Sequence, residues 1–321
     1  MSLTEKRQSQ TGIQRSFEPP APLRGTKPTP TLNLISLCAV IRTVWRLDRV
    51  TRLWRNGGMR HLFALCFALC ALPLAAQQMV EVDVELVLAV DVSRSMTPDE
   101  LDIQRRGYAA ALSSDVVYGA IRGGMIGNIA VTYVEWAGES SQTVVVPWTL
   151  IDSREAVEEF ARRLTAWSSP GMRRTSISGA LLYSADMFEA NRFTGLRRVI
   201  DISGDGPNNQ GPPVTQARDR VLSKGITING LPLMTQDEMS STWGIPDLDV
   251  YYTNCVVGGP GAFVVPVFSW DQFAAAVRRK LVLEIAGQAQ RPEATIRKAQ
   301  AYDCLIGEKV WQRNRRYFDL P

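Results

Sequence analysis

The stretch VELVLAVDVSRSMTPDE, residues 84–100, decides the fold. Its first seven residues are mostly apolar and strand-forming, and this run ends abruptly at Asp91. Ser93 and Ser95 follow at alternate positions. The next segment, TPDE at 97–100, offers a threonine N-cap, a proline at the first helical position and a glutamate three residues after the cap. A buried strand that ends in oxygen-bearing side chains and turns into a helix is typical of the rim of an α/β sheet.

Strand and helix patterns alternate along the rest of the chain. We expect strands at 84–90, 128–136, 142–148, 197–203, 226–233 and 262–268. Helical patterns begin at Thr97 and at Asp152 with Glu155 as its capping partner, run from Ser269 to Gly287, and cover 176–191 and 213–224. This alternation predicts an α/β, doubly wound, Rossmann-like fold, with a mostly parallel central sheet and helices on both faces. Since 128–136 and 142–148 are too close for a crossover, they should form a hairpin that makes one edge strand antiparallel.

The basic charge of the chain comes from its first segment. Residues 1–58 hold ten Lys or Arg and three acids, whereas the chain from residue 59 onward holds 26 bases and 29 acids. The sequence pI of about 8.8 therefore gives no support to a nucleic-acid partner. Rich in Pro, Arg and Ser, residues 1–58 are expected to be a disordered extension or sequence upstream of the real start.

A secretory signal peptide is predicted at residues 59–76, MRHLFALCFALCALPLAA. Arg60 provides a short basic region, and the uncharged apolar run 62–76 ends in small residues, so cleavage is expected after Ala76. The run is shorter than the ~20 residues that a membrane span needs, although an uncleaved signal anchor is the alternative. We expect a periplasmic or secreted protein that meets the membrane only through this export signal.

Export would leave few reactive side chains. The one histidine, His61, lies in the signal, so a Ser-His-Asp triad, a Cys-His pair and His-ligated zinc are excluded from the mature chain. Of five cysteines only Cys255 and Cys304 would remain. In an oxidising compartment this pair predicts one disulfide, with two separate buried thiols as the alternative.

Polar side chains gather where the predicted strands end. Asp91 ends the first strand, Asp205 in DISGDGPNN ends another, and Thr175 lies with Ser176 and Ser178 in the loop RRTSISGAL. Ligands of such sheets bind beyond the carboxyl ends of the strands. Carboxylates and hydroxyls without softer ligands suit Mg²⁺, or Mn²⁺ or Ca²⁺, and without a cation the two aspartates would repel each other. The alternative is that these residues only cap loops.

These residues also carry a family resemblance. The chain resembles a von Willebrand factor A-type domain over residues 83–287, in particular an exported bacterial branch of undefined function. The metal-ion-dependent adhesion site of that family, Asp-x-Ser-x-Ser, then Thr, then Asp, is matched by Asp91, Ser93, Ser95, Thr175 and Asp205. The resemblance implies direct metal ligation by the two serines and the threonine, and water-mediated roles for the two aspartates. It also implies that an acidic side chain of a protein partner completes the octahedron.

The chain departs from that pattern in three places. It has SGDG where family members often have Thr-Asp-Gly, so Asp201 is a second candidate for the last carboxylate, although only Asp205 precedes the Gly-Pro turn. Arg173 and Arg174 directly precede the threonine, and Arg94 lies inside the first motif. These arginines either attract a partner carboxylate or are solvated loop charges.

We therefore predict an exported, metal-dependent, adhesion-type module that holds an acidic residue of a protein partner through a divalent cation, and not an enzyme. The alternative is a Mg-dependent periplasmic hydrolase or phosphatase, since a strand-end Asp can accept a phosphoryl group. Aspartyl phosphatases of the haloacid-dehalogenase type carry a second Asp two residues later, where this chain has Ser93. The expected organisation is an extension (1–58), the signal (59–76), a von Willebrand factor A-like domain (77–287) and a C-terminal tail (288–321).

Overall fold

The structure is a computed structural model that describes residues 79–166, 170–235, 243–287 and 302–318. The predicted extension and signal peptide lie outside the described residues, so these two predictions stay untested. Across the described segments, no helix combines the length and the apolar character that a membrane crossing requires.

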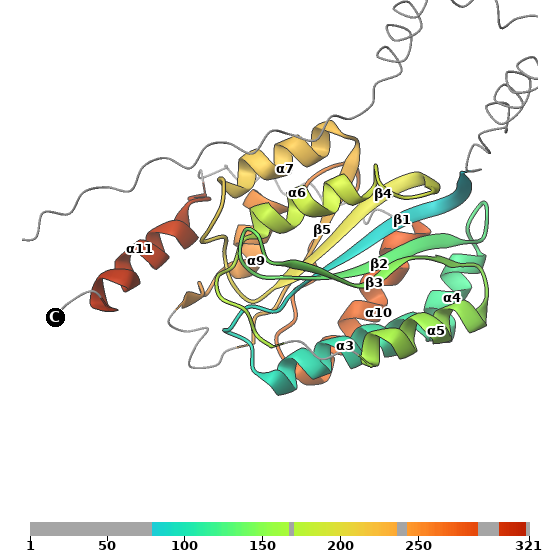
Figure 1. Ribbon diagram of the computed structural model, residues 1–321, viewed down its shortest axis with the longest axis horizontal. Helices are drawn as coiled ribbons and strands as arrows, with labels where there is room; N and C mark the ends of the chain where they lie inside the picture. Colours follow the sequence, from blue (N-terminus) through green and yellow to red (C-terminus); the bar gives the residue numbers. More distant parts are fainter. Residues whose placement is uncertain (1–78, 167–169, 236–242, 288–301, 319–321) are drawn as a thin grey trace, which may run out of the picture. The chain divides into compact units, whose positions relative to one another are not determined.

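The core of the described chain is a five-stranded sheet with the order β3-β2-β1-β4-β5. Its strands are β1 (Val80–Asp91), β2 (Ile129–Trp136), β3 (Gln142–Ile151), β4 (Phe193–Gly204) and β5 (Ile226–Pro232). All neighbouring strands pair in parallel except β2 and β3, which form the antiparallel hairpin. The prediction of a mostly parallel, doubly wound sheet with one antiparallel edge strand is confirmed (Figure 1).

Helices cover both faces of this sheet (Figure 1). On one face lie α3 (Pro98–Leu112), α4 (Asp115–Arg122), α5 (Arg154–Thr165) and α10 (Trp270–Ala286). On the other lie α6 (Ile177–Met187), α7 (Val214–Ser223), α9 (Leu248–Tyr251) and the π-helical turn η1 (Tyr252–Val256). Strand β1 is buried from both sides: Leu86 and Leu88 pack toward the first group, Val87 and Ala89 toward the second. This burial explains why its sequence is a nearly continuous apolar run.

Capping residues fix where the helices begin. The capping box predicted at Thr97 and Glu100 is present, and α10 follows Ser269 and ends at Gly287, whose left-handed φ of 65° suits a glycine. The predicted cap at Asp152 is wrong by one residue, because Ser153 accepts the hydrogen bond from the backbone N–H of Ala156. Both residue types are good caps, so their order in the sequence does not distinguish them.

The predicted strand 262–268 is not a regular strand. It makes only isolated parallel bridges to the edge of β5, Gly230 to Val264 and Leu233 to Val267. Val265 donates to Gly230 and Val267 donates to Pro232, at 3.0 Å each. The residue that should donate between these two bonds is Pro232, which has no N–H, so the ladder cannot form continuously.

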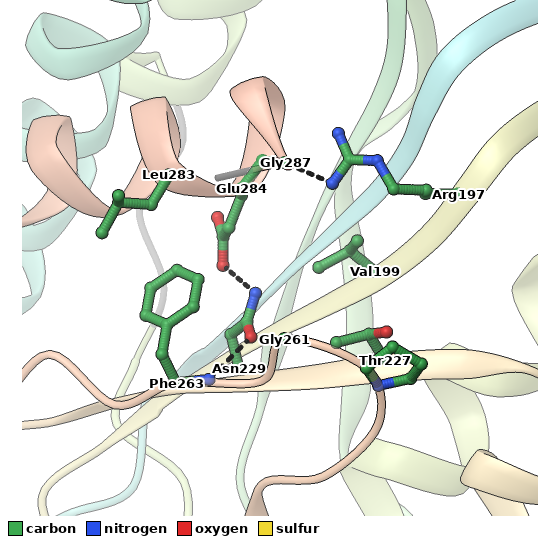
Figure 2. Close-up of a pocket in the computed structure, with 10 residues that line it drawn as sticks. Arg197, Val199, Thr227, Asn229, Gly261, Phe263, Leu283, Glu284 and Gly287 are labelled. Carbon is green, nitrogen blue, oxygen red and sulfur yellow. Dashed lines mark hydrogen bonds between the residues drawn. The ribbon is translucent and has the colours of Figure 1, made fainter. Parts of the chain in front are cut away.

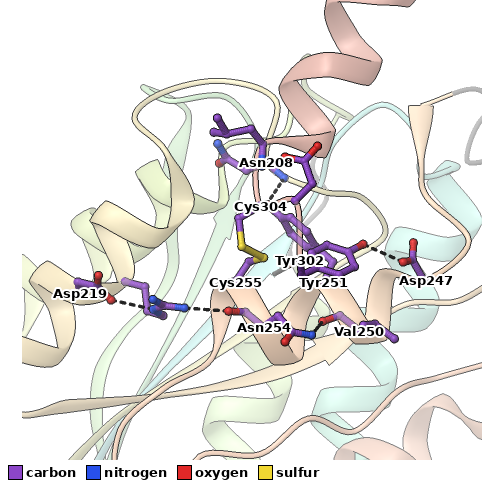
Figure 3. The surroundings of a disulfide bond; sticks show 12 residues. Asn208, Asp219, Asp247, Val250, Tyr251, Asn254, Cys255, Tyr302 and Cys304 are labelled. Carbon is purple, nitrogen blue, oxygen red and sulfur yellow. Dashed lines mark hydrogen bonds and ion pairs between the residues drawn. A yellow bond between two sulfur atoms is a disulfide. The ribbon is translucent and has the colours of Figure 1, made fainter. Parts of the chain in front are cut away.

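The predicted C-terminal tail contains helix α11 (Ile306–Phe318). The predicted disulfide is present: Cys255 in η1 is bonded to Cys304, with their Cα atoms 5.5 Å apart (Figure 3). Tyr302 packs edge-on against Tyr251, with ring centroids 6.1 Å apart. The chain just before α11 is therefore fastened to the domain both covalently and by packing.

Candidate metal site

Four of the five predicted ligands are linked at the carboxyl end of the sheet. The backbone N–H of Ser93 donates to Asp91 Oδ1 at 2.7 Å, directly after β1 ends. The hydroxyls of Ser93 and Ser95 are 3.0 Å apart, and Ser95 donates to Asp205 Oδ1 at 2.9 Å. The loop after β1, which carries the first motif, therefore lies beside Asp205, the aspartate that follows β4.

Thr175 joins this group through its backbone. Its N–H donates to Asn209 Oδ1 at 3.0 Å, and Asn209 N–H donates back to the Thr175 carbonyl at 2.8 Å. A Cβ atom on Gly206 would lie 4.0 Å from Thr175 Oγ1, so the threonine hydroxyl lies beside the loop that carries Asp205.

The two aspartates are electrostatically unfavourable neighbours. Asp91 is fully buried and Asp205 is 8% exposed. Burial, and then the charge of Asp205, raise the pKa of Asp91 well above its ordinary value, although the Ser93 backbone N–H opposes this. Among the described residues, Asp91 Oδ2 has no hydrogen-bond partner. A buried carboxylate beside a second one requires a proton or a cation.

Small and hydroxyl-bearing residues shape the space around Asp91. A Cβ atom on Gly204 would lie 2.9 Å from Asp91 Oδ2 and 3.0 Å from the Tyr252 hydroxyl, so only glycine leaves both atoms undisturbed. Burial, and then the charge of Asp91, raise the pKa of Tyr252 well above its ordinary value. Tyr252 is therefore a neutral phenol.

The side chains present fit a hard divalent cation. Carboxylate and hydroxyl oxygens are the ligands that Mg²⁺, Mn²⁺ and Ca²⁺ take in proteins. Ser93, Ser95 and Thr175 would hold the ion directly, with the two aspartates behind them. In the described segments no group of three or more His, Cys, Asp or Glu could hold a metal, so the hydroxyls are essential to such a site. A bound ion would supply positive charge between the carboxylates and a position for an anionic ligand.

Asp201, the second candidate for the last carboxylate, has a different partner. It is fully buried on β4, and its Oδ1 lies 2.7 Å from Nζ of Lys280 on α10. The aspartate that Ser95 contacts is Asp205.

Sequence reasoning missed two residues that support the site from behind. Asn208 accepts a hydrogen bond from the Ser178 backbone and donates through Nδ2 to Glu308 Oε1 on α11, at 3.0 and 2.8 Å. Its own N–H donates to the Tyr251 hydroxyl at 3.1 Å. An asparagine after a Gly-Pro turn is a signal for such loop bonds, whereas nothing near Glu308 in the sequence indicates its role.

The contact between Glu308 and Asn208 gives a first prediction. Glu308→Ala should leave the domain folded but weaken Mg²⁺ binding several-fold, because the loop of Asp205 loses a support that holds it in place. Titration calorimetry of the two proteins measures this. Gln312→Ala, on an exposed position of the same helix, should bind Mg²⁺ as the wild type does. Equal affinity of Glu308→Ala and wild type would contradict the prediction.

The entrance to the site carries several guanidinium groups. Arg174 has a left-handed backbone, with φ 78°, and its Cζ lies 3.8 Å from the centre of the Trp311 ring on α11. Partial burial, and then Arg315 and Arg173, lower the pKa of Arg174. Arg173 is exposed and makes no ion pair with a described residue. A non-glycine residue with this backbone is strained, and such strain is commonest at functional sites.

The raised pKa of Asp91 predicts how metal-free stability depends on pH. The folded state keeps a proton that the unfolded chain releases near the ordinary value of 3.8. Stability in EDTA should therefore fall as the pH rises from about 4 towards the raised pKa. Asp91→Asn should remove this part of the pH dependence, which is seen by subtracting melting curves of the variant from those of the wild type. Parallel curves for the two proteins from pH 4 to 8 would show that Asp91 ionises normally.

A family model described as a protein of unknown function, DUF1194, matches residues 81–289, which is more than half of the chain. The chain belongs to the DUF1194 family. None of the curated proteins matches it.

Several solved structures resemble this DUF1194 protein at low identity. They include the pilus adhesin SpaC of Lactobacillus rhamnosus GG, at 14% identity and TM-score 0.47, and a von Willebrand factor type A protein of Catenulispora acidiphila, at 15% and 0.43. Another is proximal thread matrix protein 1 of the mussel byssus with a zinc-occupied MIDAS motif, at 14% and 0.44. The alignments cover 64%, 64% and 65% of this chain, but only 30%, 43% and 49% of those chains, respectively.

Proposed function

We propose that this DUF1194 protein is an exported, metal-dependent protein-binding module. A divalent cation, Mg²⁺ or alternatively Mn²⁺ or Ca²⁺, would be held by Ser93, Ser95 and Thr175, with Asp91 and Asp205 acting through water. An acidic side chain of a protein partner would complete its coordination. The proposal includes export through the signal peptide at 59–76 to the periplasm or cell exterior.

One observation carries this proposal. Hydrogen bonds connect Asp91, Ser93, Ser95 and Asp205, and the buried Oδ2 of Asp91 has no hydrogen-bond partner among the described residues. Loop capping would account for the bond from the Ser93 N–H to Asp91. It does not account for a second carboxylate brought in from a different strand, which costs electrostatic energy unless a cation lies nearby. Neutral hydroxyl ligands leave such a cation with much of its charge, and it therefore favours an anionic ligand from outside.

The surroundings of the site support an acidic partner. Arg173 and Arg174 come directly before Thr175, and Arg94 lies within the first motif. An added Cβ on Gly171 would lie 3.7 Å from Cα of Arg94, so the two loops that bear these arginines are in contact. The chain from residue 59 onward is otherwise slightly acidic, with 26 bases and 29 acids. Arginines at the entrance would attract carboxylates and increase the association rate.

Crosslinked capture from periplasmic extract tests the proposal. With Mg²⁺ the wild-type protein should retain a partner that EDTA releases, and Asp205→Ala should retain none. Asp99→Ala removes an exposed carboxylate outside the site and should behave like wild type. Arg173→Glu should lower the yield of partner without removing its dependence on metal. Capture that is the same in EDTA and in Asp205→Ala would refute a metal-dependent function.

The alternative function, a phosphatase activity at the same site, predicts a different result. It would turn over a phosphate ester such as p-nitrophenyl phosphate in the presence of Mg²⁺, and Asp91→Asn would abolish the turnover. We expect no turnover by either protein.

A further inference from the structure

A buried group of charged side chains lies between α10 and the sheet. Asp201 on β4 and Asn229 on β5 are direct cross-strand partners. Helix α10 presents Lys280 and Glu284 to them, one turn apart. Asp201 and Lys280 are fully buried, and Glu284 and Asn229 are 2% and 3% exposed. Such complete burial of a lysine with two carboxylates is uncommon, because removing the charges from water is costly.

Lys280 lies between the two carboxylates. Its Nζ is 2.7 Å from Asp201 Oδ1, but without the alignment of a hydrogen bond, and neither Asp201 oxygen has a hydrogen-bond partner among the described residues. Nζ also donates to Glu284 Oε1, which accepts a second bond from Asn229 Nδ2 at 3.0 Å (Figure 2). Asn229 Oδ1 accepts from the backbone N–H of Phe263 at 3.2 Å. The asparagine therefore holds Glu284 against the amine.

The surroundings disfavour keeping all three groups charged. The Lys280 amine lies 5.5 Å from the centre of the Phe263 ring, and the group adjoins the apolar core under α3 and α10. Burial raises the pKa of Asp201, although Lys280 opposes this. Burial, and then the charge of Asp201, raise the pKa of Glu284 to about 7. A protonated carboxyl group is therefore more accessible here than it is in water.

We propose that Lys280 and Asp201 condense into an amide that joins Nζ to Cγ and covalently links helix α10 to strand β4. Lys280 first gives a proton to Asp201 across their 2.7 Å contact. The lone pair of the resulting amine then attacks Cγ of the protonated carboxyl group, and the Nζ–Cγ bond forms. Glu284 accepts a proton from Nζ and delivers it to the departing hydroxyl, so the Cγ–O bond breaks and one water leaves. Nothing is oxidised or reduced, and no co-reactant is needed.

Two physical effects favour this reaction. The two groups are held 2.7 Å apart, and well-oriented intramolecular reactions reach effective concentrations of about 10⁵ M or more. The product is a neutral amide, so two buried opposite charges and their desolvation cost disappear. A cavity of about 290 Å³ that Glu284 and Asn229 line, beside Gly261 and Arg197, offers the released water an exit (Figure 2).

The mass of the purified, disulfide-reduced protein tests the bond. We expect a measured mass 18 Da below the mass calculated for the sequence that begins at the N-terminus of the purified protein. Tandem mass spectrometry should also identify a branched peptide that contains both Asp201 and Lys280. Lys280→Arg and Glu284→Gln should both show the full mass, the first because it removes the amine and the second because it removes the proton carrier. A full mass for wild type after prolonged incubation would overturn the proposal.

Two internal controls sharpen the result. Lys309 and Asp303 are as close, at 2.6 Å, but their side chains are 60% and 46% exposed, and their peptides should remain unlinked. Cyclisation of Asp205 with Gly206 would also release water, but it would leave the peptides of Asp201 and Lys280 separate. A loss of 18 Da without the branched peptide would therefore also overturn the proposal.

Discussion

Millimolar Mg²⁺ should raise the melting temperature of the mature protein by roughly 5–10 °C, and Ser93→Ala or Asp205→Ala should abolish the rise. A ligand bound only by the native state, at 100 times its Kd, adds about 2.7 kcal/mol to the free energy of unfolding. For a domain of this size each kcal/mol corresponds to about 2–4 °C. Thermal denaturation with and without Mg²⁺ measures the shift, and Asp99→Ala, outside the site, should retain it in full.

The same experiment without metal separates a cation site from simple capping. Burial, and then the charge of Asp205, raise the pKa of Asp91. Asp205→Ala removes the second of these causes, so its metal-free form should melt at the wild-type temperature or slightly above. Capping alone predicts a loss on the order of 1 kcal/mol and no effect of metal in any variant. A wild-type melting curve that millimolar Mg²⁺ leaves unmoved would exclude the proposed cation site.

The local sequence was sufficient to predict the strands of the sheet and to predict that the loops with Asp91 and Asp205 lie at the same edge of it. Near-continuous apolar runs identified all five strands, because a parallel sheet buries its strands on both faces. Asp91 and Asp205 could be placed at one edge because the carboxyl ends of parallel strands meet there. Their linkage through the two serine hydroxyls needed the three-dimensional fold, since the bond from Ser95 to Asp205 spans 110 residues.

Features that depend on tertiary contacts could not be predicted. Helix α11 is amphipathic, but it was missed because its few apolar residues lie within a polar and basic tail. The partnership of Lys280 with Asp201 joins residues from different elements, and a lysine in a helix is normally exposed. Pro232 has no effect on the prediction of β5 itself, but it prevents the next segment from pairing continuously.

Replacing both Cys255 and Cys304 with serine should lower the free energy of unfolding by about 4 kcal/mol, and the melting temperature by roughly 10 °C. The reason is the sequence separation of 49 residues, since closing a loop of that length removes much of the entropy of the unfolded chain. Thermal and urea denaturation of the oxidised wild type and the double variant measure the difference. Similar melting temperatures would show that packing alone holds the C-terminal segment.

The double variant should also bind Mg²⁺ more weakly, by about as much as Glu308→Ala. Cys304 lies four residues before Glu308, so without the disulfide only packing and polar contacts hold α11 near Asn208. The stacking of Arg174 on Trp311 would weaken with them. The two variants separate the effects: Glu308→Ala should lose metal affinity with little loss of stability, whereas the double serine variant should lose both. A double variant that is less stable but keeps full affinity would show that the site does not depend on the position of α11.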